Sequence, residues 1–113
     1  MDFAYVFGSV AVGRQTPRSD VDLAVHVSGP ADGWAVRLDV VRAASSHLGT
    51  DAVDVVLLNA APIALAGRIL TSRRVVLDRV PFARHRYESL TARMFQNFRI
   101  REHRLLTQRY ARG

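Results

Sequence analysis

Two aspartates, Asp20 and Asp22, are the residues whose type and spacing most clearly suggest chemistry. Asp22 lies in the alternating, β-branched stretch 21–27 (VDLAVHV), which predicts a strand, and Asp20 directly precedes it. Residues i and i+2 of a strand point to the same face, so the two carboxylates would stand side by side. Such a pair is unfavourable unless a cation neutralises it, and oxygen ligands of this kind suit Mg²⁺. The alternative, a solvated strand face, is disfavoured by the surrounding valines and leucine.

A third carboxylate, Asp54, sits inside the apolar stretch 52–58 (AVDVVLL), which predicts another strand. A lone Asp in so apolar a strand is costly without a partner. If this strand lies beside residues 21–27, Asp54 can face the other two carboxylates. Three carboxylates can hold two metal ions and polarise an incoming hydroxyl. Asp51 competes for this role, but its place at the start of the strand favours a turn residue.

Gly8 and Ser9 follow the short apolar run 3–7, which predicts a buried strand, and they precede an expected helical turn. A glycine lets a phosphate approach the backbone, and a helix start offers free N–H groups to an anion. The Ser9 hydroxyl can add a hydrogen bond. Alone, the pair is equally typical of an ordinary helix cap. Its significance comes from its spacing to Asp20 and Asp22.

The remaining elements must position these residues. We expect a helix over 34–48 ended by Gly49, a short helix opened by Pro62, and an edge strand at 74–77. The nearly all-apolar stretch 52–58 favours a central strand. The alternation predicts a small α/β domain over 1–80 with a helical tail over 81–113, one domain overall. A helix over 81–110 would be about 45 Å long, so it must either break near Phe95–Phe98 or project.

The charge is uneven along the chain of 113 residues, whose formal net charge is +6. Residues 1–78 hold seven Arg and eight Asp, whereas residues 79–113 hold nine Arg and two Glu. The basic tail indicates an acidic partner or a phosphate backbone. RNA is the less favoured of these, because only Tyr87 and Tyr110 offer stacking and no RNA-binding motif is present.

Cysteine is absent from the chain, which excludes disulfides and thiolate metal sites. No apolar run approaches the roughly 20 residues needed to cross a bilayer. The N-terminal sequence lacks the features of a signal peptide. We therefore expect a cytoplasmic protein without a membrane segment.

The spacing of the chemical residues resembles a known family. Gly8-Ser9, ten residues and then Asp20-Val21-Asp22 match the G-S-x10-D-x-D pattern of the polymerase-β-like nucleotidyltransferases. The triplet Val53-Asp54-Val55 resembles that family's third carboxylate. The longer segments GSVAVGRQTPRSDVDLAV, VDVVLLNAAP and RILTSRRVVLDR are similar to the MNT branch, the minimal nucleotidyltransferases.

The resemblance implies a mixed β-sheet flanked by helices, and transfer of a nucleoside monophosphate from a triphosphate to a hydroxyl with release of pyrophosphate. It implies two Mg²⁺ ions held by three aspartates, the third of which also serves the hydroxyl, and a triphosphate held by a Gly-Ser turn with help from loop arginines. Carried onto this sequence, these residues are Asp20, Asp22 and Asp54 for the metals and catalysis, and Gly8, Ser9, Arg14 and Arg18 for the nucleotide.

MNT proteins commonly act as antitoxins of HEPN toxins, which are RNases, and add AMP to a toxin tyrosine. The resemblance therefore implies ATP as donor and a HEPN toxin as partner in a hetero-oligomer. Two alternatives stay open. One is an antitoxin that only binds and covers its toxin, although the intact carboxylates favour catalysis. The other is a nucleotidyltransferase acting on tRNA or a small molecule, and the lack of a substrate domain disfavours an antibiotic-modifying enzyme.

Overall fold

The computed structural model describes residues 1–8, 21–28, 33–49 and 52–111. This part of the chain forms a four-stranded sheet with three α-helices and one short 3₁₀ turn. The strands are β1 (Phe3–Phe7), β2 (Val21–His26), β3 (Val53–Leu57) and β4 (Arg74–Asp78). The helices are α1 (Gly33–Leu48), η1 (Leu58–Ala60), α2 (Ile63–Ser72) and α3 (Pro81–Ala111).

The sheet is mixed, with the strand order β3-β2-β1-β4. Strand β1 is antiparallel to both of its neighbours, whereas β2 and β3 are parallel. The prediction of a mixed sheet flanked by helices is confirmed, and so is the edge position of β4. The prediction that the third strand is central was wrong, because β3 is the other edge. The residues of β3 are apolar because helices cover both of its faces. That covering does not require a hydrogen-bonded strand on both sides.

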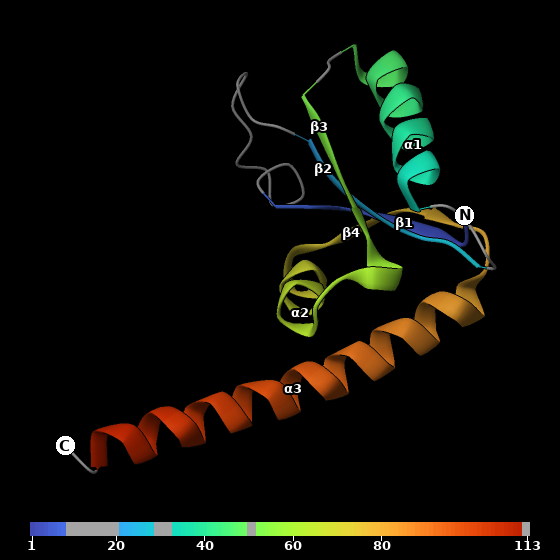
Figure 1. The fold of residues 1–113 in the computed structure, drawn as a ribbon. Helices are drawn as coiled ribbons and strands as arrows, with labels where there is room; N and C mark the ends of the chain where they lie inside the picture. Colours follow the sequence, from blue (N-terminus) through green and yellow to red (C-terminus); the bar gives the residue numbers. More distant parts are fainter. Residues whose placement is uncertain (9–20, 29–32, 50–51, 112–113) are drawn as a thin grey trace.

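The helices lie in two layers on opposite faces of the sheet, α1 on one side and α2 with α3 on the other (Figure 1). The alternation of β1 divides the core accordingly. Phe3 and Tyr5 are fully buried and pack with Ile69 of α2. Ala4 points the other way and packs with Val25 on the face that α1 covers. This two-sided burial fixes the register of β1, because a slip of one residue would exchange the two faces.

The amino-terminal part of α3 is fastened to the sheet domain. The Tyr87 ring lies 5.7 Å from the Phe3 ring, centroid to centroid. Glu88 accepts hydrogen bonds of 2.6 Å from both Arg73 and Arg84, which join the start of β4 to α3. Arg84 also contacts Asp78 at 3.0 Å. This charged cluster and the aromatic contact together set the direction of the helix.

Beyond this anchor, α3 continues without a break, since neither Gly nor Pro occurs between its first residue and Ala111. Its 31 residues span about 46 Å at a rise of 1.5 Å per residue. Of the two expected outcomes, the helix projects rather than breaks, and its carboxyl-terminal part extends past α2 (Figure 1). The radius of gyration, 16.3 Å, exceeds the roughly 13 Å expected of a compact chain of this length.

Helix α1 ends as predicted at Gly49, whose φ of 67° closes the helix with an N–H bond of 2.9 Å to the Ser45 carbonyl. No helix in the described ranges is both long and apolar enough to cross a membrane.

Candidate functional site

Asp22 and Asp54 stand opposite each other on the parallel strands β2 and β3. Paired residues of a parallel ladder project to the same face, and the strands lie about 4.8 Å apart. The face is the one that α2 and α3 cover, because Ala24 and Val56, two positions further along, pack in that core. The Asp22 side chain is half-buried and that of Asp54 is exposed. Strand pairing therefore brings two of the predicted carboxylates together at one end of the sheet.

Gly8 closes this site from the end of β1. Phe7 is the residue of β1 paired with Asp22, and Gly8 follows it with a φ of 74°. A Cβ atom built on Gly8 would lie 2.7 Å from Oδ2 of Asp22, closer than real Cβ contacts come. The left-handed backbone and this close approach both require glycine here. The Gly8 backbone and the Asp22 carboxylate therefore touch, as a site for a phosphate and a cation requires.

The donor chemistry of the pair fits a hard divalent cation, which takes carboxylate oxygens as ligands. Two carboxylates on adjacent strands also repel each other unless a cation lies between them. Within the described residues, no group of three or more His, Cys, Asp or Glu side chains comes together. The described part of the site therefore supplies two carboxylates and one glycine.

The other predicted site residues lie outside the described ranges. These are Ser9, Arg14, Arg18 and Asp20, together with the competing candidate Asp51. Asp20 directly precedes Val21, whose N–H donates a 2.8 Å hydrogen bond to the Ala52 carbonyl at the start of β3. The β2–β3 pairing thus begins immediately after Asp20.

Asn59 stabilises the sheet, a role that the sequence analysis did not predict. Its side-chain amide accepts a 3.0 Å bond from the Val27 N–H and donates a 2.6 Å bond to the Val27 carbonyl. The amide thereby extends the β2–β3 ladder by one rung beyond the last residue of β2. Because register along a parallel pair is shared, this contact also supports the pairing of Asp22 with Asp54 at the other end. In the sequence, Asn59 lies within the segment VDVVLLNAAP, which indicated only a family resemblance.

A second polar cluster, also unpredicted, lies where β2 ends. The buried Asp2 carboxylate accepts a short hydrogen bond from the Ser28 hydroxyl and lies 3.1 Å from Nδ1 of His26. The Ser28 bond, against the opposing effect of burial and with help from His26, holds the pKa of Asp2 below its ordinary value. Serine and histidine both contact the same carboxylate oxygen rather than each other, so this is not a nucleophilic triad. The Asp2 carbonyl also accepts N–H bonds from Arg79 and Val80, so the cluster ties three segments together.

A mixed sheet that brings two carboxylates beside a glycine turn is the arrangement expected of a nucleotidyltransferase of the polymerase β kind. Residues 1–81 match the family model described as "Polymerase beta, Nucleotidyltransferase", and the chain belongs to this family. Its fold is similar to that of solved toxin–antitoxin structures that contain MntA. No curated protein matches the chain significantly.

Several similar solved structures are toxin–antitoxin complexes. One, a toxin–antitoxin complex with AMP-PNP, has a TM-score of 0.77 and 25% identity over 95% of this chain and 84% of that one. A second is the tri-AMPylated Shewanella oneidensis HEPN toxin in complex with its MNT antitoxin, with a TM-score of 0.69, 22% identity, and coverage of 95% and 81%. A third, the MntA-HepT complex, has a TM-score of 0.68, 22% identity and the same coverage. The likeness extends over nearly the whole chain, α3 included.

Proposed function

We propose that this chain is an antitoxin that transfers AMP from ATP to a hydroxyl group, a tyrosine of a cognate HEPN toxin, and so neutralises it. The observation that carries the proposal is the register pairing of Asp22 with Asp54, with the Gly8 backbone against Asp22. Two carboxylates and a phosphate-permitting glycine at one sheet end are what nucleotidyl transfer requires. The AMP-PNP in one similar structure and the AMPylated toxin in another support the choice of donor and acceptor.

In the proposed reaction, the acceptor hydroxyl oxygen forms a bond to the α-phosphorus of ATP. The bond from that phosphorus to the bridging oxygen of the pyrophosphate breaks, and pyrophosphate leaves with the electron pair. The hydroxyl proton passes to Asp54, the exposed carboxylate and the one open to an incoming acceptor. The backbone of Gly8 and the hydroxyl of Ser9 hold the triphosphate, with help from Arg14 and Arg18.

Asp20, Asp22 and Asp54 would hold two Mg²⁺ ions, which supply charge neutralisation on the triphosphate and a lower pKa for the acceptor hydroxyl. The protein's own contribution is positioning. The β2–β3 ladder fixes the spacing between Asp22 and Asp54, and the absence of a side chain at Gly8 lets the Asp22 carboxylate lie against the β1 turn. Holding reactants in this way is a large part of catalysis in phosphoryl transfer.

The test incubates the purified protein with labelled ATP, Mg²⁺ and the HEPN protein encoded by the neighbouring gene. The variants Asp22→Asn and Asp54→Asn should each reduce label transfer by about two orders of magnitude or more. Asp39→Asn is the matched control, because Asp39 is an exposed aspartate of helix α1, outside the carboxylate pair. Omitting Mg²⁺ should abolish the label in every case.

The alternatives are distinguished in the same experiment. Rescue of a toxic neighbour by Asp22→Asn/Asp54→Asn without any label transfer would replace catalysis with neutralisation by occlusion. Label that appears on RNA or on a small molecule, and not on the HEPN protein, would replace the proposed acceptor and keep the enzyme class.

A further inference from the structure

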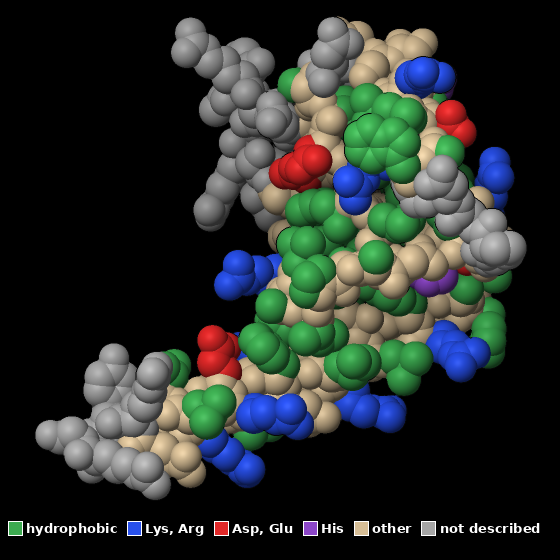
Figure 2. All heavy atoms as spheres, in the orientation of Figure 1, with side chains coloured by type: hydrophobic (Ala, Val, Ile, Leu, Met, Phe, Trp, Pro, Cys, Tyr) green, Lys and Arg blue, Asp and Glu red, His purple; other side chains and the backbone are tan. Residues whose placement is uncertain are grey.

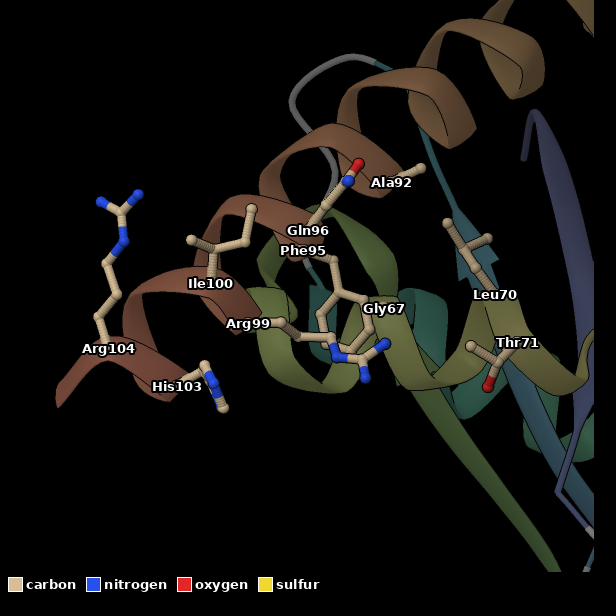
Figure 3. A pocket seen from close by; sticks show the side chains of 10 residues that line it. All are labelled: Gly67, Leu70, Thr71, Ala92, Phe95, Gln96, Arg99, Ile100, His103 and Arg104. Carbon is tan, nitrogen blue, oxygen red and sulfur yellow. The ribbon is translucent and has the colours of Figure 1, made fainter. Parts of the chain in front are cut away.

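A groove runs between α2 and the projecting part of α3. Neither Asp22 nor Asp54 lines it. The two helices touch at Gly67, where a built Cβ atom would lie 2.1 Å from the Phe95 ring. Beside this contact the helices leave a hollow of about 770 Å³. Figure 3 shows Leu70 and Thr71 contributed by α2, and Phe95 and Arg99 reaching from α3. A hollow of this volume lies within the range of ligand-binding pockets, so it can bury several side chains of a bound protein.

The groove has an apolar floor and a basic rim. Among the lining residues, we call the apolar Leu70, Phe95 and Ile100 the floor and the basic Arg99, His103 and Arg104 the rim. The Arg99 guanidinium lies 5.9 Å from the Phe95 ring centroid, so it covers the floor at one edge. Residues 93–104 hold four arginines and one glutamate, a formal net charge of +3. A complementary occupant is therefore apolar at its centre and acidic at its margins.

The projecting part of α3 exposes large apolar side chains that a helix in water does not normally carry together. Ile100, which lines the groove, is 45% exposed, whereas Met94 (56%) and Leu105 (60%) lie outside the groove lining. Figure 2 shows hydrophobic and arginine side chains interleaved along this arm. Contiguous exposed apolar surface with a polar border marks an interaction site more often than an ordinary surface.

The arm extends to the side of the molecule where the catalytic end of the sheet lies. In Figure 1 β1 ends at the left, β2 begins at the upper left and β3 begins near the top, whereas α3 projects to the lower left. These strand ends carry Gly8, Asp22 and Asp54. A protein held on the arm would therefore extend from the same side of the molecule as the end of β1.

We propose that the groove between α2 and the distal half of α3 docks an amphipathic helix of the partner protein. The apolar stripe of that helix enters against Phe95 and Ile100, and carboxylates beside the stripe pair with Arg99 and Arg104. Recognition of an amphipathic helix by an apolar groove is a recurring mode of protein binding. The identity of the partner as a HEPN toxin rests on the proposed function, whereas the groove itself rests on its shape, exposure and charge.

The test measures affinity for the purified HEPN protein of the neighbouring gene by calorimetry, without ATP. Ile100→Glu/Arg104→Glu should weaken binding at least tenfold, because it puts a charge on the floor and reverses one on the rim. Arg101→Glu is the matched control. It makes the same charge reversal on the same arm, outside the groove, and should weaken binding less than threefold. Circular dichroism confirms that each variant keeps its helix.

Equal affinity of the groove variant and the wild type overturns the proposal, and so does the absence of any complex with the wild type. A dimer of this chain alone that Ile100→Glu/Arg104→Glu abolishes would assign the groove to a second copy and overturn it too. The enzyme proposal is tested separately. Asp22→Asn should lower label transfer and leave the affinity for the HEPN protein unchanged, so label transfer at the wild-type rate would contradict the enzyme proposal alone. Conversely, the groove variant should regain transfer at high HEPN concentration, with KM raised and kcat retained.

Discussion

Replacing Gly8 with alanine tests whether the close approach of the β1 turn to Asp22 matters for catalysis. The φ of 74° at Gly8 lies in the left-handed region, where a side chain costs about 1 to 2 kcal/mol. The added Cβ atom would also meet Oδ2 of Asp22 at 2.7 Å, so the carboxylate or the turn must move by a few tenths of an ångström or more. Gly8→Ala therefore both strains the backbone and displaces Asp22, a carboxylate that we propose to be catalytic.

Two separate losses are expected from Gly8→Ala. The backbone strain should lower the melting temperature by roughly 4 to 8 °C in a chain of this size. The displaced carboxylate should lower kcat/KM for label transfer between about tenfold and a hundredfold, since a misplacement near 1 Å can cost about a hundredfold. Thermal unfolding followed by circular dichroism measures the first loss. Initial rates at 25 °C, where the variant stays folded, measure the second.

Gly49→Ala is the matched control for the backbone. Gly49 has a φ of 67°, and a Cβ atom built on it meets nothing within 4 Å. The variant should lose a similar amount of stability and keep the wild-type rate. Label transfer by Gly8→Ala at the wild-type rate, or an equal loss of activity in the two variants, would refute a catalytic role for this close approach.

Three further predictions concern stability. Gly67→Ala should cost about 1 to 3 kcal/mol in urea unfolding, because the Phe95 ring must yield to the new Cβ, and adding Phe95→Leu should recover part of the loss. Glu88→Gln should cost about 1 to 3 kcal/mol, since it weakens charge-assisted bonds to two partly buried arginines, and an unchanged unfolding midpoint would contradict this. Asp2→Asn should destabilise the protein at neutral pH. The pKa of Asp2 is lowered on folding, mainly by the Ser28 bond, so its ionised form stabilises the fold above the ordinary value of 3.8. That advantage is lost as the pH falls through the lowered pKa, so the gap between wild type and variant should close below about pH 4.

The sequence by itself determined the local elements, and it predicted the chemistry that we propose for the site. Alternation and β-branched residues predicted all four strands, and the apolar spacing predicted α1 and its end at Gly49. These signals are local, because a strand or a helix buries one set of side chains at its own period. The placement of Asp22 and Asp54 on strands followed from the same patterns. The type of chemistry followed from the carboxylates and their spacing to Gly8.

Only the tertiary structure decided how these elements meet. Strand order is set by packing between distant segments, so the apolar stretch of β3 could not distinguish an edge covered on both faces from a centre. The pairing of Asp22 with Asp54 likewise needed the parallel register that β2 and β3 adopt. The sequence left open whether α3 breaks or projects. Its uninterrupted helix-forming residues and the anchor at Glu88 decide for projection. No Gly or Pro stops the helix before Ala111, and residues 101–108 are exposed among the described residues.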